Sequence, residues 1–227
     1  MKIGIIVAMN KELNLLLPLM DNAVKVVHDS ITFHCGTIGN HRVFAMQCGI
    51  GKVNSAIGAL TMINVFAPQL VINTGVAGGT GSDAGIMDIV IGQRIAYHDV
   101  WCGPNTEWGE AAGCPRFFTS SSRLVNMPLF DNDPKVKRGL IASGDIFVSK
   151  VEEVERFKAL YPDVMAVDME SAAIAQVCYL RHIPFFCMRV ISDTPGSGSN
   201  IAQYENFWEE APEHTFSLLK LLLNSID

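Results

Sequence analysis

Four carboxylates in this sequence adjoin apolar runs: Glu12, Asp168, Glu170 and Asp193. A carboxyl group in apolar surroundings has a raised pKa, so it can hold a proton near neutral pH or exchange one with a ligand. Each of the four also has a purely structural explanation, because acidic residues are common at the N-cap and in the first turn of a helix. They form a candidate site for proton transfer only if the fold brings them together.

Two glycine-rich segments have the composition of ligand-binding loops. Residues 74–79 follow an apolar run, but they match neither the GxGxxG pattern nor the Lys-Ser/Thr ending of a phosphate-binding loop. Their glycines permit either a close ligand or a tight turn, and the local pattern favours the turn. Residues 49–52 begin a helical pattern, where backbone N–H groups are free. Lys52 fits a functional role and a solvated first-turn position equally well.

The spacing of apolar residues predicts strands that alternate with helices. Strands are expected at Lys2–Val7, Ile31–Cys35, Val43–Gln47, Gln69–Asn73, Ile89–Ile91, Arg138–Ala142, Val164–Val167 and Phe185–Ile191. Helices are expected through Leu13, Leu16, Leu17 and Met20, at Lys52–Phe66, Lys150–Tyr161 and Met169–Leu180, and from about Tyr204 to Leu223 with a kink or a new start at Pro212. A glycine-rich loop is expected at Gly75–Gly81.

Apolar strands alternating with helices predict an α/β protein whose parallel or mixed sheet is covered on both faces. No linker rich in Pro, Gly or Ser divides the 227 residues, so we expect a single domain, 1–227. Ligands of such folds bind at the carboxyl ends of the strands. The four carboxylates fall at those ends, beside Phe147 and Arg189. This coincidence is the first indication of a binding site.

The composition excludes several classes of protein. Hydrophobic residues make up 49% of the chain and charged residues 18%, which does not fit a disordered or fibrous protein. The net charge of −6 argues against a broad basic face for nucleic acid or anionic membranes. Six cysteines without CxxC spacing and six scattered histidines predict free thiols and no metal site. We expect a cytoplasmic protein, because the apolar start lacks a signal-peptide cleavage pattern and no run of about 18 apolar residues could span a membrane.

Seven motifs spread over nearly the whole chain have a recognisable order. They are Met1–Met9 with Glu12, Gly49–Asn54, Asn73–Gly79, Tyr97–Asp99, Ser143–Phe147, Val167–Ala172 and Arg189–Asp193. In this order they resemble the bacterial 5′-methylthioadenosine/S-adenosylhomocysteine nucleosidases of the purine nucleoside phosphorylase/nucleosidase superfamily. The amino-terminal Glu12 favours the hydrolytic branch of that superfamily.

The resemblance implies a three-layer α/β/α sandwich around a central twisted mixed sheet, in a protein that is usually a homodimer. The implied enzyme uses neither a metal nor an organic cofactor. Its reaction is hydrolysis of the N-glycosidic bond of an adenine nucleoside with a 5′-thio substituent, giving adenine and a 5-thioribose. 5′-Deoxyadenosine is a further candidate substrate.

The resemblance also implies a role for individual residues. Asp193 matches the general acid that protonates N7 of the purine, and Glu12 matches the base that activates the attacking water, helped by Arg189. Glu170 matches the carboxylate that binds the ribose hydroxyls, and Met169 packs against the sugar.

The base and the 5′ group have their own expected contacts. Phe147 would stack on adenine while the backbone of Val148 reads its polar edge. Ala8, Met9 and Ile50 fit a pocket for the 5′-alkylthio group. Further residues expected at the nucleoside are Val76, Ala77, Gly78, Asp168 and Ser192, and an aromatic lid, for which Tyr204 is favoured over Phe207.

Three features depart from the family pattern. Val76 stands where many members have a serine that helps to hold the water, and Asp168 stands where a glutamate is common. The loop Val100–Gly113, with Trp101 and Trp108, differs from its counterparts. In the family this loop reaches toward the partner subunit's site, so a homodimer with the 100–113 loop near that site is expected.

Three other functions stay open at this point. A nucleoside phosphorylase needs arginines to bind phosphate, whereas this chain offers Glu12 in the first loop and no arginine in the strand before Gly75. A futalosine-type hydrolase would share the fold and the chemistry. A nucleoside-binding module without catalysis would not need both an acid at Asp193 and a base at Glu12.

Overall fold

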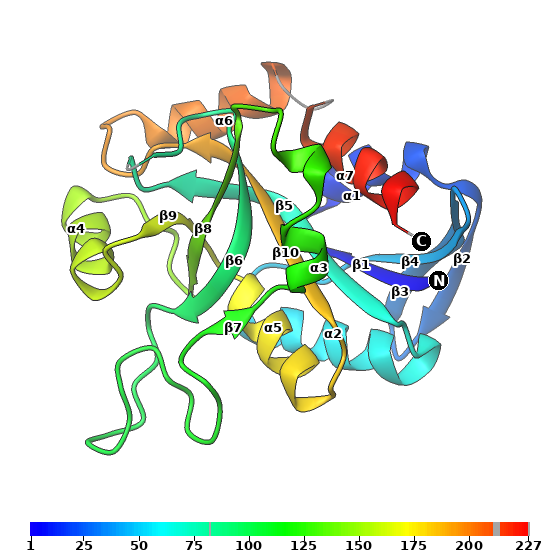
Figure 1. The fold of residues 1–227 in the computed structure, drawn as a ribbon, viewed down its shortest axis with the longest axis horizontal. Helices are drawn as coiled ribbons and strands as arrows, with labels where there is room; N and C mark the ends of the chain where they lie inside the picture. The colour runs from blue at the N-terminus through cyan, green and yellow to red at the C-terminus, as the bar shows by residue number, and fades with distance from the viewer. Residues whose placement is uncertain (82, 211–213, 227) are drawn as a thin grey trace.

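Strands and helices alternate along the chain in the computed structural model, which describes residues 1–81, 83–210 and 214–226 (Figure 1). The strands are β1 (Lys2–Val7), β2 (Asp21–His28), β3 (Ile31–Ile38), β4 (His41–Gln47), β5 (Leu70–Gly79), β6 (Ile89–Tyr97), β7 (Phe118–Thr119), β8 (Val136–Ser143), β9 (Val164–Asp168) and β10 (Phe185–Asp193). The helices are α1 (Asn10–Leu16), α2 (Lys52–Phe66), α3 (Ser122–Val125), α4 (Val151–Leu160), α5 (Ser171–Leu180), α6 (Asn200–Glu210) and α7 (His214–Ser225). Short 3-10 helices lie at Leu17–Leu19 and Pro128–Phe130.

The strands form one mixed sheet in which part of the sheet closes on itself. From one edge the order runs β2, β3, β4, β1, β5, and β5 then pairs with both β10 and β9. β10 continues through β6 and β8 back to β9, so β5, β10, β6, β8 and β9 form a ring. The pairings of β5 with β1 and β10 are parallel. The carboxyl ends of these three strands therefore lie side by side.

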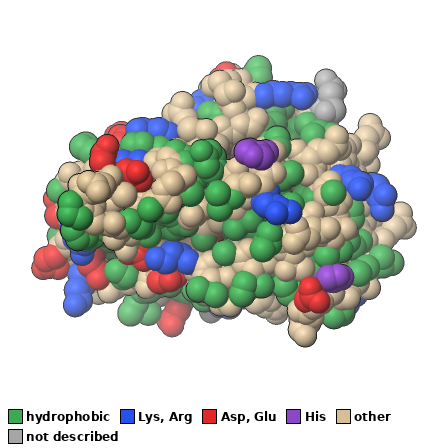
Figure 2. Space-filling model, turned by 90° about the horizontal axis from the view of Figure 1, so that it is seen from below, with side chains coloured by type: hydrophobic (Ala, Val, Ile, Leu, Met, Phe, Trp, Pro, Cys, Tyr) green, Lys and Arg blue, Asp and Glu red, His purple; other side chains and the backbone are tan. Residues whose placement is uncertain are grey.

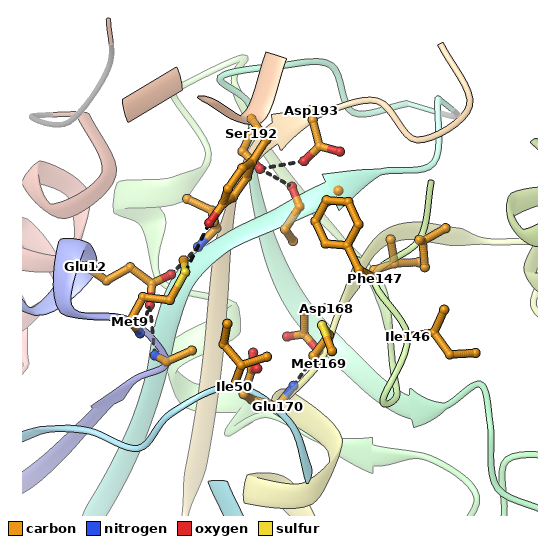
Figure 3. Close-up of a pocket in the computed structure, with 17 residues that line it drawn as sticks. Met9, Glu12, Ile50, Ile146, Phe147, Asp168, Met169, Glu170, Ser192 and Asp193 are labelled. Atoms are coloured by element: carbon orange, nitrogen blue, oxygen red, sulfur yellow. Dashed lines mark hydrogen bonds between the residues drawn. The ribbon is translucent and has the colours of Figure 1, made fainter. Parts of the chain in front are cut away.

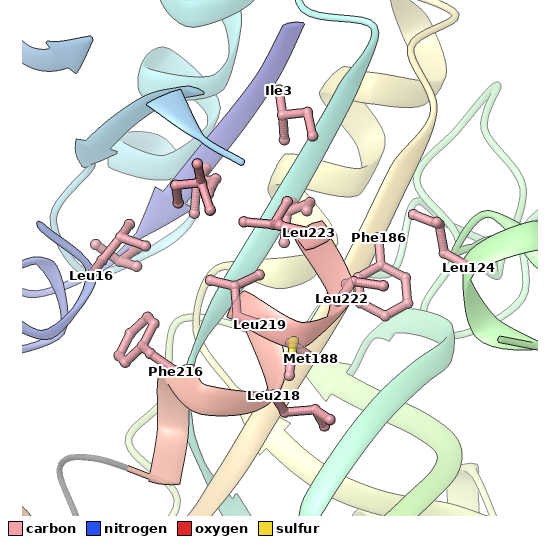
Figure 4. Close-up of a cluster of buried hydrophobic side chains, with 14 of the residues drawn as sticks. Ile3, Leu16, Leu124, Phe186, Met188, Phe216, Leu218, Leu219, Leu222 and Leu223 are labelled. Atoms are coloured by element: carbon pink, nitrogen blue, oxygen red, sulfur yellow. The ribbon is translucent and has the colours of Figure 1, made fainter. Parts of the chain in front are cut away.

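Helices cover both faces of the sheet, which confirms the expected α/β/α sandwich (Figure 1). On one face, α7 inserts Leu219 and Leu222 against Phe186 and Met188 of β10 (Figure 4). On the other face, α2 and α5 pack against the sheet in a second buried cluster. A third cluster joins α4 to β8 and β9. Within the described part of the chain, no helix is both long and apolar enough to cross a membrane.

The glycine-rich segment after Asn73 is strand as far as Gly79, so the predicted loop at Gly75–Gly81 is wrong except for its last two residues. β5 continues to Gly79, and Gly75 and Val76 pair with Arg189 and Val190 of β10. Glycine is needed at position 75 because its φ of +145° disfavours other residues and because a Cβ there would collide with Glu12 Oε1. Here the glycine serves close packing of side chains within the protein.

The sequence pattern also missed some boundaries. β2 was not predicted, because its residues are exposed on the sheet edge and lack the alternation of a half-buried strand. The first helix ends at Leu16, and Pro18 lies in the short 3-10 turn that follows it. The helical region after Asn200 contains α6 and α7, while the expected kink at Pro212 falls outside the described residues.

Candidate active site

A pocket opens where β1, β5, β9 and β10 reach their carboxyl ends (Figure 3). Nearly all of the residues that the sequence nominated line it together: Ala8, Met9, Glu12, Ile50, Val76, Ala77, Gly78, Phe147, Val148, Asp168, Met169, Glu170, Ser192, Asp193 and Tyr204. They come from seven separate stretches of the chain, so only the tertiary fold assembles the pocket.

Arg189 differs from the other nominated residues, because it lies beneath the pocket and does not line it. Its Nε donates to Asp168 Oδ2 at 2.8 Å, and its Nη2 donates to Asn73 Oδ1 at 2.5 Å. Nη2 also lies 4.0 Å from Glu170 Oε2. Buried among acidic groups, the guanidinium affects the pocket through the carboxylates around it.

Glu12 is almost fully buried and is held by three backbone N–H groups. Oε2 accepts hydrogen bonds from Ala8 at 2.8 Å and Met9 at 2.9 Å, and Oε1 accepts one from Val76 at 3.0 Å. Burial raises the pKa of Glu12, while the charge of Arg189 and the three hydrogen bonds oppose the rise. The carboxyl group is therefore fixed in position and suited to gain a proton during a reaction.

A comparison with Glu153 in α4 shows that burial sets the pKa of Glu12 apart from that of an ordinary helix-capping glutamate. Both residues sit in the first turn of a helix and accept backbone hydrogen bonds from the residues before it. The pKa of Glu153 is lowered by those hydrogen bonds, because the side chain stays in contact with water. The pKa of Glu12 is raised because burial outweighs the same bonds. Helix capping alone therefore does not account for Glu12.

Asp168 and Glu170 flank Met169 at the start of α5 but have different environments. Asp168 Oδ1 accepts hydrogen bonds from Ser171 N at 3.2 Å and Ser171 Oγ at 2.9 Å, and its other oxygen binds Arg189. Glu170 Oε1 accepts one hydrogen bond, from Gly51 N at 2.9 Å. Burial and the nearby charge of Asp168 raise the pKa of Glu170 to about 7. Asp168 is thus a structural anchor, while Glu170 retains acceptor capacity at the pocket wall.

Asp193 ends β10 at a shift in the register with β5, between Ile191 and Asp193. Such irregularities redirect a side chain, and here the carboxyl group lines the pocket. Ser192 Oγ donates to Asp193 Oδ1 at 2.7 Å. Burial raises the pKa of Asp193, and hydrogen bonds from Ser192 and Asn200 only partly oppose the rise. A protonated carboxyl group at this wall could donate to a ligand.

Two aromatic side chains, Phe147 and Tyr204, also line the pocket. Phe147 is 49% exposed and meets Tyr204 edge to face, with ring centroids 6.1 Å apart. The Tyr204 hydroxyl donates to Met9 Sδ at 3.1 Å. Phe207 is buried in the core beneath α6 and does not reach the pocket. Of the two lid candidates, Tyr204 is therefore the one beside the site.

Sequence reasoning missed three residues of this region. Ile146 and Val167 line the pocket beside residues that were nominated. Both belong to motifs that had been noted, Ser143–Phe147 and Val167–Ala172, but neither was nominated as a site residue. Asn73, which binds Arg189, also donates to the Ile6 carbonyl at 2.9 Å. A polar residue in the apolar run of β5 was the available signal for Asn73.

Apart from Tyr204, the ionisable groups that line the pocket are carboxylates. Among residues 1–81, 83–210 and 214–226, no three His, Cys, Asp or Glu side chains lie in a group that could hold a metal ion. Cys48 lies near Glu12 and Glu170, and burial and these two charges raise its pKa far above neutrality. The Cys48 thiol is therefore not suited to act as a nucleophile.

Comparison with known proteins identifies the family. A family model described as the phosphorylase superfamily matches residues 2–224. The chain belongs to this superfamily. A 5′-methylthioadenosine/S-adenosylhomocysteine nucleosidase of Anoxybacillus flavithermus is 35% identical, with 100% of both chains covered. The structure of a Streptococcus pneumoniae nucleosidase of the same name, solved with the transition-state inhibitor MT-ImmA, matches with a TM-score of 0.94 and 35% identity over 100% of both chains.

A second kind of hydrolase in the superfamily is also similar. The structure of the futalosine hydrolase of Helicobacter pylori matches with a TM-score of 0.90 and 28% identity, covering 99% of this chain and 98% of the other. Both kinds of relative are hydrolases by name. The comparisons therefore place the chain among the nucleosidases. They do not distinguish 5′-methylthioadenosine or S-adenosylhomocysteine from futalosine as the substrate.

The close packing of Glu12 and Arg189 around Gly75 can be tested by adding a methyl group at position 75. In Gly75→Ala, the added Cβ would collide with Glu12 Oε1 and lie 2.9 Å from Arg189 Nη1. Gly81→Ala is the matched control, because Gly81 also has a positive φ (+73°) but has open space around it. We expect Gly75→Ala to lose about 1–3 kcal/mol more unfolding free energy than Gly81→Ala in urea denaturation. Equal losses would show that the charged groups tolerate the methyl group.

Proposed function

We propose that this protein hydrolyses the N-glycosidic bond of 5′-methylthioadenosine and S-adenosylhomocysteine, releasing adenine and a 5-thioribose. The observation that carries the proposal is the pair of buried carboxyl groups, Glu12 and Asp193, that line one pocket and both have raised pKa values. The full-length relatives named as nucleosidases for these two compounds support the choice of reaction.

The first chemical task is to make adenine a good leaving group. Breaking the bond between C1′ and N9 leaves negative charge on the purine and positive charge on the sugar. Asp193, with its raised pKa, would donate a proton to N7, so that the base departs neutral. Ser192 would keep the acid oriented through its hydrogen bond to Oδ1.

The second task is to deliver water to C1′. Glu12 would accept a proton from the water as its oxygen bonds to the cationic sugar carbon. Its three backbone donors fix the carboxylate so that one direction is left for the water. Val76 contributes its backbone N–H to Glu12 but has no side-chain hydroxyl for the water. Glu12 alone would thus orient the nucleophile in this chain.

The remaining pocket residues fit the rest of the nucleoside. Glu170 would accept hydrogen bonds from the ribose hydroxyls, with Met169 against the sugar face. Phe147 would stack on adenine, and Met9 and Ile50 would surround the 5′ substituent. Arg189 would act as a positioning residue, because it holds the acidic groups and does not line the pocket.

Other reactions of the superfamily fit the pocket less well. A phosphorylase would have to bind phosphate beside Glu12, and two anions at one site repel each other. Arg189 would not relieve this repulsion, because its guanidinium lies beneath the pocket, bound to Asp168 and Asn73. Futalosine and 5′-deoxyadenosine share the bond that is cleaved, so they are the compounds to test beside the two proposed substrates.

We expect the acid and the base to be individually essential. Asp193→Asn and Glu12→Gln should each lower kcat by about 10²–10⁴-fold, because each removes one proton transfer. Release of adenine from 5′-methylthioadenosine, with and without phosphate, is the measurement. Near-normal turnover in either variant would remove that residue from the mechanism. A strict requirement for phosphate would replace hydrolysis by phosphorolysis.

Substitution of two aromatic residues of α6, Tyr204 and Phe207, should distinguish a role in substrate binding from a role in stability. Tyr204→Ala should raise KM with little change in Tm, because Tyr204 lines the pocket. Phe207→Ala should lower stability by about 3–5 kcal/mol, because it empties a core position. Thermal unfolding and steady-state kinetics on both variants check this. A large fall in Tm with unchanged KM for Tyr204→Ala would show that its ring serves packing.

We also propose a homodimer that uses the outer face of α2. Val53 and Ile57 on this helix are 70% and 55% exposed, and hydrophobic side chains spread over the same side of the molecule (Figure 2). Ile50 extends the apolar surface to the pocket mouth. Trp101 and Trp108, stacked in the 100–113 loop, would then lie near the partner's pocket. Exposed apolar surface of this kind is typical of a protein interface.

The dimer can be tested by sedimentation. Wild-type protein should sediment at twice the chain mass, and Ile57→Asp should shift it to the monomer, because a buried unpaired charge opposes association. Leu221→Asp is the control, because Leu221 is similarly exposed but lies on α7. A monomeric wild-type protein, or dissociation by both variants alike, would rule out the α2 interface.

A further inference from the structure

A cluster of charged groups lies just behind the pocket wall, at the start of α2. Asp99 Oδ2 accepts hydrogen bonds from Lys52 Nζ at 2.7 Å and from Asp145 N at 2.8 Å. Asp145 Oδ1 accepts a hydrogen bond from Lys52 N at 2.8 Å. None of these three residues lines the pocket. They connect the first turn of α2, the chain after β6 and the chain after β8 in one network.

This network adjoins both walls of the pocket. On one side, Gly51 N donates to Glu170 Oε1, and Ile50 lines the pocket. On the other side, Asp145 directly precedes Ile146 and Phe147, which line the pocket as well. A displacement of the α2 turn would therefore move the wall that carries Glu170 and the wall that carries Phe147.

Lys52 is held by two carboxylates, an arrangement that a solvated surface lysine would not need. Lys52 is the first residue of α2, where the positive end of the helix dipole disfavours a cation. Two carboxylates offset this cost, since Asp99 binds the ammonium group and Asp145 binds the helix N–H. The Lys52 and Asp99 side chains are only 24% and 17% exposed, so water screens their attraction weakly.

The segment that follows Asp145 depends on this anchor. Residues 144–150 contain neither helix nor strand, and Phe147 is half exposed. Their far end is fixed by a hydrogen bond from Gly196 N to the Ser149 carbonyl at 3.2 Å. At the near end, Asp145 contributes both its N–H and its carboxylate to the network. Phe147 thus lies between these two attachments, with Tyr204 against its ring.

We propose that Lys52, acting through Asp99 and Asp145, is a positioning residue that holds Phe147 over the bound nucleoside. The inference rests on the proposed function and extends it to residues that do not touch the substrate. A positioning role of this kind predicts a loss in binding, with the proton-transfer steps at Asp193 and Glu12 largely preserved.

The kinetic experiment compares Lys52→Met, Lys52→Arg and the control Lys158→Met. Lys158 forms an exposed ion pair with Glu155 on α4, away from the network. Lys52→Met should raise KM for 5′-methylthioadenosine about tenfold while kcat changes by less than about threefold. Lys52→Arg should restore most of the affinity, and Lys158→Met should match wild type. Asp145→Ala, whose side chain is 47% exposed, should reproduce the effect even if Lys52→Met fails to fold.

A double-mutant cycle with Phe147→Ala identifies the route of the effect. If Lys52 acts through Phe147, Lys52→Met should change KM by less than about twofold in the Phe147→Ala background. The full tenfold change in that background would overturn the inference, as would unchanged KM in both Lys52→Met and Asp145→Ala.

Hydrogen–deuterium exchange separates this inference from the proposed function. The amides of residues 145 and 146, which donate hydrogen bonds to Asp99 Oδ2 and the Gly144 carbonyl, should exchange at least about tenfold faster in Lys52→Met or Asp145→Ala than in wild type, with no change in Lys158→Met. This measurement needs no substrate. If the wild-type protein failed to release adenine, the proposed function would fall, while faster exchange would still support the anchor. Unchanged exchange would overturn the anchor whatever the activity.

Discussion

The buried guanidinium of Arg189 is the interaction on which the rest of this site depends. It pairs directly with Asp168 and lies close enough to Glu170 and Glu12 to oppose the rise in their pKa values. Burying carboxylates without a cation would cost several kcal/mol each. The cation can reach them only because β10 runs parallel to β5 and because position 75 has no side chain. The position of this one charge thus depends on both the strand order and the glycine.

Asp193 is set apart from that group by what surrounds it. The groups that lower its pKa, Ser192 and Asn200, are neutral, whereas Arg189 lowers the pKa of Glu12 and of Glu170. One cation placed at one side of the pocket therefore opposes the rise in the pKa of Glu12 and of Glu170, while the rise in the pKa of Asp193 is opposed by neutral groups. Environments that separate the proton affinities of carboxyl groups are how a single site can hold both an acid and a base.

The sequence was informative where a local pattern decides the structure. The long apolar strands were predicted because their residues are buried. The helix Lys52–Phe66 was predicted from the spacing of its apolar residues, although Val53 and Ile57 are exposed. The Gly75–Gly81 segment was misjudged because its conformation is set by β10, which is distant in sequence. The pocket residues were nominated through family motifs and the strand-end rule. The position of Arg189 beneath the pocket could not be predicted, since it depends on contacts with Asn73 and Asp168.

The ring of strands has a consequence for the order in which the molecule can be made. β5 joins β1 early in the chain, but its partner on the other side is β10, and the paired residues Asn73 and Cys187 are 114 positions apart. During synthesis, the amino-terminal strands emerge with one apolar edge uncovered until the last third of the chain arrives. Contacts this distant in sequence are slow to form. The nascent chain must therefore stay soluble while the edge of β5 is unpaired. Arg189 reaches Asp168 and Glu12 only when β10 pairs with β5 and closes the ring.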